Sequence, residues 1–158
     1  MNRRYAGLAA LAVSLSGAGL ASAQELRLTP TEIAGMAKGG AGVGTSGVAG
    51  IQTTILNGDP SRTGPYTIEI RVPPNTHIAA HSHKDDRTAV VVSGTWYFGY
   101  GQQASEQLVK SLPPGSFYAE PKRLAHFAMT KSEPARVYIT GYGPTDTEYV
   151  DLATAPAR

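Results

Sequence analysis

Histidines are the residues of this 158-residue chain whose type and spacing suit chemistry. His77, His81 and His83 lie in one short stretch, and His126 comes much later. Residues two apart in an extended strand share a face, so His81 and His83 should project together, and His77 has the same parity. Two imidazoles on one face, joined by a third from a distant strand, form a facial metal site with open positions. The spacing of His81 and His83 therefore favours a metal site over a structural role for this pair.

The donor atoms that the chain offers restrict the metal. The sequence contains no cysteine, which excludes a disulfide framework, a zinc finger and a thiol nucleophile. Imidazole combined with water or carboxylate suits iron, manganese, nickel, copper or zinc. Because neutral imidazole is the ligand, we expect metal affinity to fall as the pH drops through about 6.5.

Short strands are the elements that must position these histidines. The chain has 18 glycines and 11 prolines, and charged residues make up only 16%, which favours a turn-rich fold over a helical bundle. Apolar and polar residues alternate through 66–72, as is typical of a half-buried strand. The expected strands are 51–56, 66–72, 89–98, 107–112, 117–119, 126–129 and 137–142. We therefore expect an all-β sandwich or barrel over residues 51–158.

Residues 1–23 have the features of a secretory signal peptide. Arg3 and Arg4 precede an apolar run over 6–20, and an Ala-Ser-Ala cleavage site follows at 21–23. The run is shorter than the about 20 residues that span a bilayer. Cleavage would remove two arginines and no acidic residue, leaving equal numbers of basic and acidic residues. We expect a periplasmic or secreted protein that binds a small molecule, and neither nucleic acid nor an anionic membrane.

Residues 24–50 form a leading segment before the barrel. Thr29 as N-cap, Pro30 in the first turn and Glu32 completing a capping box predict a short helix that ends near Lys38. Six glycines in residues 39–50 predict a mobile loop or linker. Residues 24–38 and strand 51–56 are also candidates to cover an exposed sheet edge in a homodimer.

The stretch 75–94 resembles the first sequence motif of the cupins. That motif is Gly, five residues, His-x-His, three or four residues, Glu, six residues, Gly. His81, His83 and Gly94 match it, whereas Asn75 stands at the first glycine and Arg87 at the glutamate.

The stretch 115–130 resembles the second cupin motif, which is Gly, five residues, Pro-x-Gly, two residues, His, three residues, Asn. Gly115, Pro121 and His126 match it, whereas Arg123 replaces the second glycine and Thr130 the asparagine. The resemblance covers about residues 51–150. It implies a cupin-type double-stranded β-helix, or jelly-roll barrel, that holds a divalent metal through His81, His83 and His126.

Arg87 is the departure from the motif that most affects the chemistry, because a guanidinium cannot be a metal ligand. It either turns away into an exposed salt bridge with Asp85, Asp86 or Glu120, or stays in the cavity and holds an anionic substrate. Glu120 is the best substitute for the missing carboxylate. His77, which we expect at the cavity mouth, is the other candidate for proton transfer.

Two classes of function follow from this resemblance. The first is a metal-dependent enzyme acting on a small, carboxylated or aromatic metabolite, with the three-histidine site resembling that of the cupin dioxygenases. The second is a non-enzymatic cupin that binds or senses a metal or a small molecule.

Overall fold

The computed structural model describes residues 25–157, so the expected signal peptide at 1–23 lies outside the described residues. Two short helices flank ten strands. The elements are α1 (Pro30–Gly35), β1 (Gln52–Asn57), β2 (Gly64–Val72), β3 (His77–Ser82), β4 (Arg87–Ser93), β5 (Trp96–Tyr100), β6 (Lys110–Leu112), β7 (Phe117–Glu120), β8 (His126–Met129), β9 (Ala135–Gly143), β10 (Glu148–Tyr149) and the 3₁₀ helix η1 (Leu152–Thr154). Over the described range, neither helix is long and apolar enough to cross a membrane.

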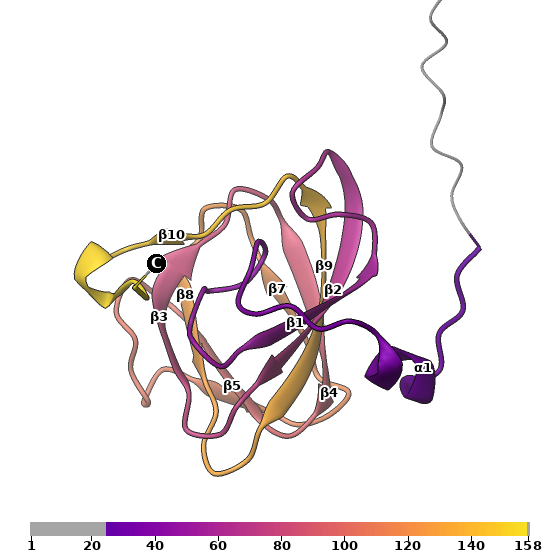
Figure 1. Cartoon of the computed structure of the whole chain (residues 1–158). Helices are drawn as coiled ribbons and strands as arrows, with labels where there is room; N and C mark the ends of the chain where they lie inside the picture. Colours follow the sequence, from indigo (N-terminus) through magenta and orange to yellow (C-terminus); the bar gives the residue numbers. More distant parts are fainter. Residues whose placement is uncertain (1–24, 158) are drawn as a thin grey trace, which may run out of the picture.

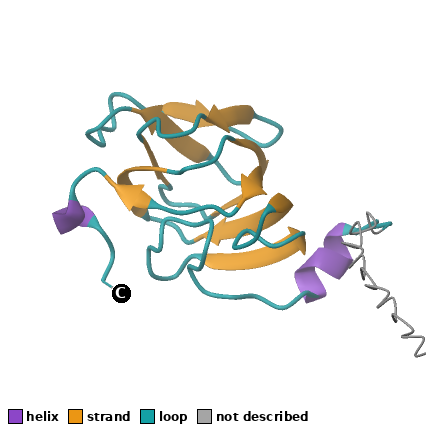
Figure 2. Cartoon of the chain, turned by 90° about the horizontal axis from the view of Figure 1, so that it is seen from above, coloured by secondary structure: helices purple, strands orange, loops and turns teal. Residues whose placement is uncertain are grey.

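The strands form two five-stranded antiparallel sheets, in the orders β1-β2-β9-β4-β7 and β10-β3-β8-β5-β6. Apart from the pairs β1–β2 and β5–β6, consecutive strands lie in different sheets, as in a jelly roll. Figure 1 shows the sheets curving around a common interior, and Figure 2 shows α1 and η1 at opposite sides of the strands. The expected all-β fold, a cupin-type jelly-roll barrel, is confirmed.

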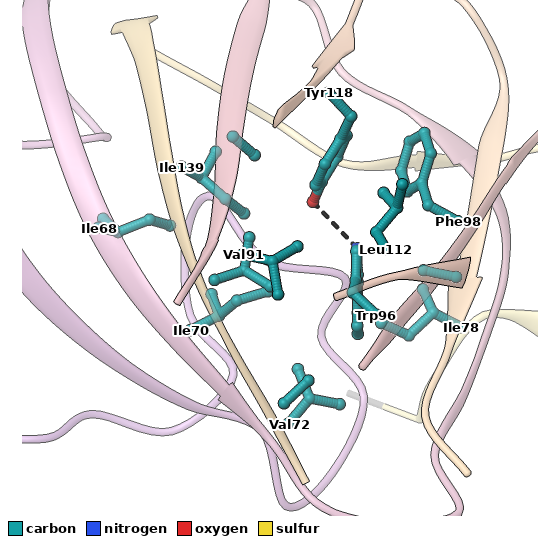
Figure 3. Close-up of a cluster of buried hydrophobic side chains, with 14 of the residues drawn as sticks. Ile68, Ile70, Val72, Ile78, Val91, Trp96, Phe98, Leu112, Tyr118 and Ile139 are labelled. Atoms are coloured by element: carbon teal, nitrogen blue, oxygen red, sulfur yellow. Dashed lines mark hydrogen bonds between the residues drawn. The ribbon is translucent and has the colours of Figure 1, made fainter. Parts of the chain in front are cut away.

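The core fills the space between the sheets. Tyr66, Ile68, Ile70 and Val72, at alternate positions of β2, are each at most 5% exposed. Figure 3 shows side chains of both sheets meeting there, with the Trp96 Nε1 group donating a hydrogen bond of 3.1 Å to the Tyr118 hydroxyl. Side chains of both sheets thus form one apolar core.

The segment expected as one strand over 89–98 is two strands in different sheets, β4 and β5. Gly94 lies between them with φ of 71°. A Cβ at this position would lie 2.0 Å from the Pro134 carbonyl oxygen, so the tight turn requires glycine. The strand expected over 107–112 is also shorter, since only Lys110–Leu112 pair.

Backbone conformation supports the alignment to both cupin motifs. Gly94 and Gly115 have φ of 71° and 86°, and the residues at the two other motif glycines, Asn75 and Arg123, have φ of 54° and 61°. Within residues 25–157, Asn75 and Arg123 are the only non-glycine residues with positive φ. The turns that the motifs encode are therefore kept where their glycines are not.

The leading segment begins with the expected capping box. The Thr29 hydroxyl accepts a hydrogen bond from the Glu32 amide, and the Glu32 carboxylate accepts one from the Thr29 amide. The helix ends at Gly35, before the expected Lys38. The glycine-rich residues after it do not form a free linker: they cross the front of the barrel (Figure 1), and Thr45 and Ser46 are buried.

Replacing Arg123 by glycine should stabilise the protein relative to Arg123→Ala. Both variants remove the exposed ion pair with Glu148, which contributes little, but only glycine relieves the left-handed backbone. We expect a difference of about 1 kcal/mol in the free energy of unfolding, measured by urea denaturation. Equal stability of the two variants would contradict a strained turn at this position.

Candidate metal centre

Three buried imidazoles meet between the barrel walls. His81 lies near the end of β3, His83 directly follows that strand, and His126 begins β8. Strands β3 and β8 are neighbours, with His81 paired to His126. One nitrogen from each ring lies within 4.8 Å of the others, and each residue is at most 5% exposed. The structure thus brings together the three histidines that the sequence selected.

The backbone orients each ring through its Nδ1 atom. In His81 and His126, Nδ1 lies 2.8 and 3.0 Å from the carbonyl oxygen two residues earlier in the chain. In His83 it lies 2.5 Å from the carbonyl oxygen of Asp146. A carbonyl only accepts hydrogen bonds, so each Nδ1 carries the proton and each Nε2 keeps a lone pair. Such a carbonyl contact is the usual outer-shell support of a metal-binding histidine.

Two of these lone pairs have no partner in the structure. The Nε2 atoms of His83 and His126 are buried and make no hydrogen bond. Burial lowers the pKa of His81 to about 3, that of His83 to about 2, and that of His126 as well. The rings are therefore neutral ligands across the physiological range. Protons should compete with a metal only at a pH well below 6.5, which is about the ordinary pKa of histidine.

An ion pair stands next to the imidazoles. Arg87 on β4 is the register partner of Glu120 on β7, and the Arg87 Nε group donates a hydrogen bond of 2.6 Å to Glu120 Oε2. Both side chains are at most 4% exposed, so the expected exposed salt bridge is wrong: the pair is buried. The second Arg87 branch donates a hydrogen bond of 2.9 Å to the Gly44 carbonyl oxygen.

Glu120 carries its charge into the histidine cluster. Its Oε2 atom lies 3.9 Å from His83 Nε2 and 3.8 Å from His126 Nε2. Burial acts to raise the pKa of Glu120, but Arg87, His126 and His83 together outweigh that effect and lower the pKa to about 2. The structure thus supplies an ionised carboxylate from β7, on the strand beside the position where the cupin motif has one.

A second carboxylate is buried behind this pair. The Tyr66 hydroxyl donates a hydrogen bond of 2.9 Å to Asp85, and the Thr145 hydroxyl donates another. A Cβ at Gly141 would lie 2.5 Å from Asp85 Oδ2 and 2.6 Å from the Tyr66 hydroxyl, so glycine makes room for this contact. Burial raises the pKa of Tyr66 to about 12, which keeps it a donor. The sequence analysis did not select Tyr66 or Thr145 as site residues. The alternation of β2 placed Tyr66 inside the barrel, but it does not show the contact of either residue with Asp85.

The charges around the imidazoles fit a cation. Arg87 balances Glu120, and Asp85 adds one further negative charge. A divalent ion would give each free Nε2 atom a partner, and the buried carboxylates of Glu120 and Asp85 would offset part of its charge. The residues present therefore fit a metal.

His77 lies on the other side of its strand. His77 pairs with Met129 and Ile78 with Ala128, but His81 pairs with His126, so β3 has one extra residue between Ile78 and His81. This β-bulge reverses the parity, and His77 is exposed while His81 is buried. The expectation that His77 shares a face with the other histidines at the cavity mouth is wrong.

The space at the centre is small. A cavity of about 20 Å³ is lined by His81, His126, Arg87 and Glu120, by apolar core residues, and by Gly44, Thr45 and Ser46 of the glycine-rich segment. This volume is enough for about one water molecule or one ion. An organic ligand does not fit in this closed form.

Comparison with known proteins supports the fold. No family model matches the chain, and no curated protein matches it. The polyketide cyclase RemF from Streptomyces resistomycificus matches with a TM-score of 0.57 and 18% identity, over 67% of this chain and 75% of that protein. A sugar phosphate isomerase of the cupin superfamily from Silicibacter pomeroyi gives 0.52 and 18%, over 65% and 67%. A cupin-2 domain from Rhodospirillum rubrum gives 0.54 and 15%, over 66% and 68%. The structural neighbours are cupin-fold proteins, and some are enzymes.

Acid should destabilise the metal-free protein through its buried imidazoles. Their pKa values lie below the ordinary 6.5, so below that pH the unfolded chain binds protons that the folded state does not. Stability should be fully present above about pH 6.5 and be lost as the pH falls, by about 1.4 kcal/mol per pH unit for each imidazole. Urea denaturation in the presence of a chelator measures this.

His81→Gln should flatten the pH profile, and His77→Gln, which removes an exposed imidazole, is the matched control. A parent protein equally stable at about pH 5 and 7 would contradict neutral buried rings.

Proposed function

We propose that this protein is a metal-dependent enzyme of the cupin fold that acts on a small, carboxylated or aromatic metabolite with dioxygenase-like chemistry. The observation that carries the proposal is the pair of buried Nε2 atoms, of His83 and His126, that have no partner within a three-histidine cluster. An unsatisfied buried polar group costs about 1–3 kcal/mol, so a ligand for these atoms is a physical expectation.

His81, His83 and His126 would hold the ion through Nε2. A bound iron, manganese, nickel, copper or zinc ion supplies a Lewis acid and, where the ion is redox-active, one-electron chemistry toward dioxygen. Glu120 is an ionised carboxylate 3.8–3.9 Å from two of the ligand atoms, so it is placed to accept a proton from a substrate held there. Arg87 keeps that carboxylate oriented and ionised, and its pKa of about 2 makes it a weak base.

The aromatic part of the proposal rests on the cavity wall. Trp96, Phe98 and Tyr118 line the cavity beside His81 and His126, and the Phe98 ring centroid lies 5.4 Å from that of His126. Such a wall suits a flat apolar group. RemF and the sugar phosphate isomerase support an enzyme by analogy of fold only.

The closed cavity favours a second candidate, a non-enzymatic module that binds or senses a metal. A space of about 20 Å³ accepts an ion but no metabolite. The two candidates differ in whether the site opens to a substrate.

Export and self-association belong to the same proposal. The sequence of residues 1–23 supports removal of a signal peptide and a periplasmic or secreted protein. Strand β1 lies at the edge of its sheet, where Gly39 of the same chain pairs with Thr53, and in a homodimer a second copy would cover the remaining backbone groups of that edge. The mature protein from an exported fraction should start at Gln24 by mass spectrometry and have a dimer mass by light scattering. An intact Met1 end contradicts export, and a monomer mass at high concentration contradicts the dimer.

Each of His81→Ala, His83→Ala and His126→Ala should lose the metal and keep the barrel. The parent should retain about one metal ion per chain by elemental analysis after dialysis, because three ligands act together. The β-sheet circular dichroism should be unchanged, since the apolar core does not depend on the ion. His77→Ala, at the exposed end of β3, is the control that keeps the metal.

Retention of the metal in His126→Ala would contradict the site. Oxygen uptake by the loaded parent with small diketones, phenols and keto acids then separates the two candidates. Uptake that disappears in His126→Ala supports the enzyme, and a loaded protein without uptake supports the binding module.

A further inference from the structure

The glycine-rich segment 42–47 separates two spaces. On its inner side lies the cavity of about 20 Å³ with the histidines. On its outer side lies a groove of about 740 Å³, whose other wall is formed by residues 145–149 and the C-terminal segment around η1. Gly44, Thr45 and Ser46 line both spaces. Ligand sites in proteins have volumes of about 300–1,000 Å³, so the outer groove alone is large enough for a ligand and the inner cavity is not. A ligand in the groove reaches the histidines only when the two spaces are joined.

Three successive carbonyl groups hold the segment in place. The Gly44 oxygen accepts from the Arg87 guanidinium at 2.9 Å. The Thr45 oxygen accepts from the Thr147 hydroxyl at 2.7 Å. The Ser46 oxygen accepts from the Tyr149 hydroxyl at 2.6 Å. Two of the donors come from the outer rim and one comes from inside the barrel.

The segment has little apolar packing of its own. Gly42, Gly44 and Gly47 have no side chain, and Val43 is 51% exposed. The Ser46 hydroxyl is buried without a hydrogen-bond partner, which is unfavourable in the closed form. Segments held by few buried apolar contacts open at low free-energy cost.

The Arg87 contact indicates which ligand would replace the segment. Nε and one terminal nitrogen of Arg87 bind Glu120, so the nitrogen bound to Gly44 is the donor that an incoming ligand would meet. With a divalent ion among neutral imidazoles, the charges of Arg87, Glu120 and Asp85 leave the interior with one net positive charge. A carboxylate oxygen balances that charge, whereas the Gly44 carbonyl does not.

We propose that residues 42–47 are a removable plug. A small monocarboxylate displaces them, takes the place of the Gly44 carbonyl on Arg87, and joins the inner cavity to the outer groove. The carboxylate preference rests on the proposed metal, whereas the opening of the segment does not.

The test uses Tyr149→Phe, alone and combined with Thr147→Val. The phenyl ring keeps its place against His81, at a centroid distance of 5.5 Å, and only the donor to Ser46 is lost. Tyr142→Phe, on the exposed part of β9, is the matched control. Deuterium exchange of residues 42–50 is measured on the metal-free protein, and benzoate and benzyl alcohol are titrated into the zinc-loaded protein. Trp96, the single tryptophan and a cavity residue, reports binding by fluorescence.

Exchange of the segment should rise in the Tyr149 variants and stay at the parent level in Tyr142→Phe. Benzoate should bind the double variant about tenfold more tightly than the parent, because less free energy is needed to open the plug. Benzyl alcohol should bind more weakly than benzoate, and Arg87→Met combined with Glu120→Gln, which removes the Arg87 donor without leaving Glu120 unpaired, should reduce that preference.

Equal benzoate affinity in the parent and the double variant overturns the plug, and equal binding of the two probes overturns the carboxylate preference. Zinc uptake by elemental analysis without benzoate binding also overturns the plug and leaves the metal site standing. Failure to take up zinc overturns the proposed function together with the carboxylate preference, and unchanged exchange in the double variant overturns the opening itself.

Discussion

Two imidazole nitrogens, buried without a hydrogen-bond partner, are the constraint on which the rest of the site depends. The Nε2 atoms of His83 and His126 face the interior because backbone carbonyls occupy Nδ1 of the same rings. The barrel tolerates the cost, about 1–3 kcal/mol for each atom, because it has an extensive apolar core (Figure 3). Low pKa values for the rings follow from the same burial. A site that is already neutral and oriented pays little further reorganisation when an ion enters.

The positively charged Arg87 stands where the first cupin motif has a glutamate, and the barrel accommodates it by pairing it with Glu120. A guanidinium about 6 Å from a divalent ion would be opposed by about 5 kcal/mol at an effective dielectric constant near 20. Glu120, the register partner of Arg87 on β7, supplies the compensating charge and directs it toward two imidazoles. The contact of Arg87 with Gly44 then connects the charged centre to the segment that closes the barrel. Arg87 therefore contacts both Glu120, which lies next to the histidines, and Gly44 of the segment 42–47.

The strand pattern and the resemblance to the two cupin motifs were sufficient to predict the barrel and the three histidines, because each motif keeps its local turns and intervals. The motif turns keep left-handed backbone even at Asn75 and Arg123, so the intervals between ligands are preserved. The prediction that His77 shares a face with His81 and His83 was wrong. The one-residue bulge that changes the face depends on the pairing of β3 with β8, so the sequence of β3 alone does not predict it. The hydrogen bond of Tyr66 to Asp85 and the packing of residues 42–47 join positions far apart in the chain, which composition cannot reveal. The glycine content predicted a mobile loop or linker at residues 39–50. Hydrogen bonds from the side chains of Arg87, Thr147 and Tyr149 instead hold residues 44–46 in place.

The most direct test of the central claim is a crystal structure of the zinc-loaded protein with anomalous difference data at the zinc edge. The account predicts one peak per chain, about 2.0–2.1 Å from Nε2 of His81, His83 and His126, with each Nδ1 still on its backbone carbonyl. A peak outside the cluster, coordination through Nδ1, or a site that omits His126 would contradict it.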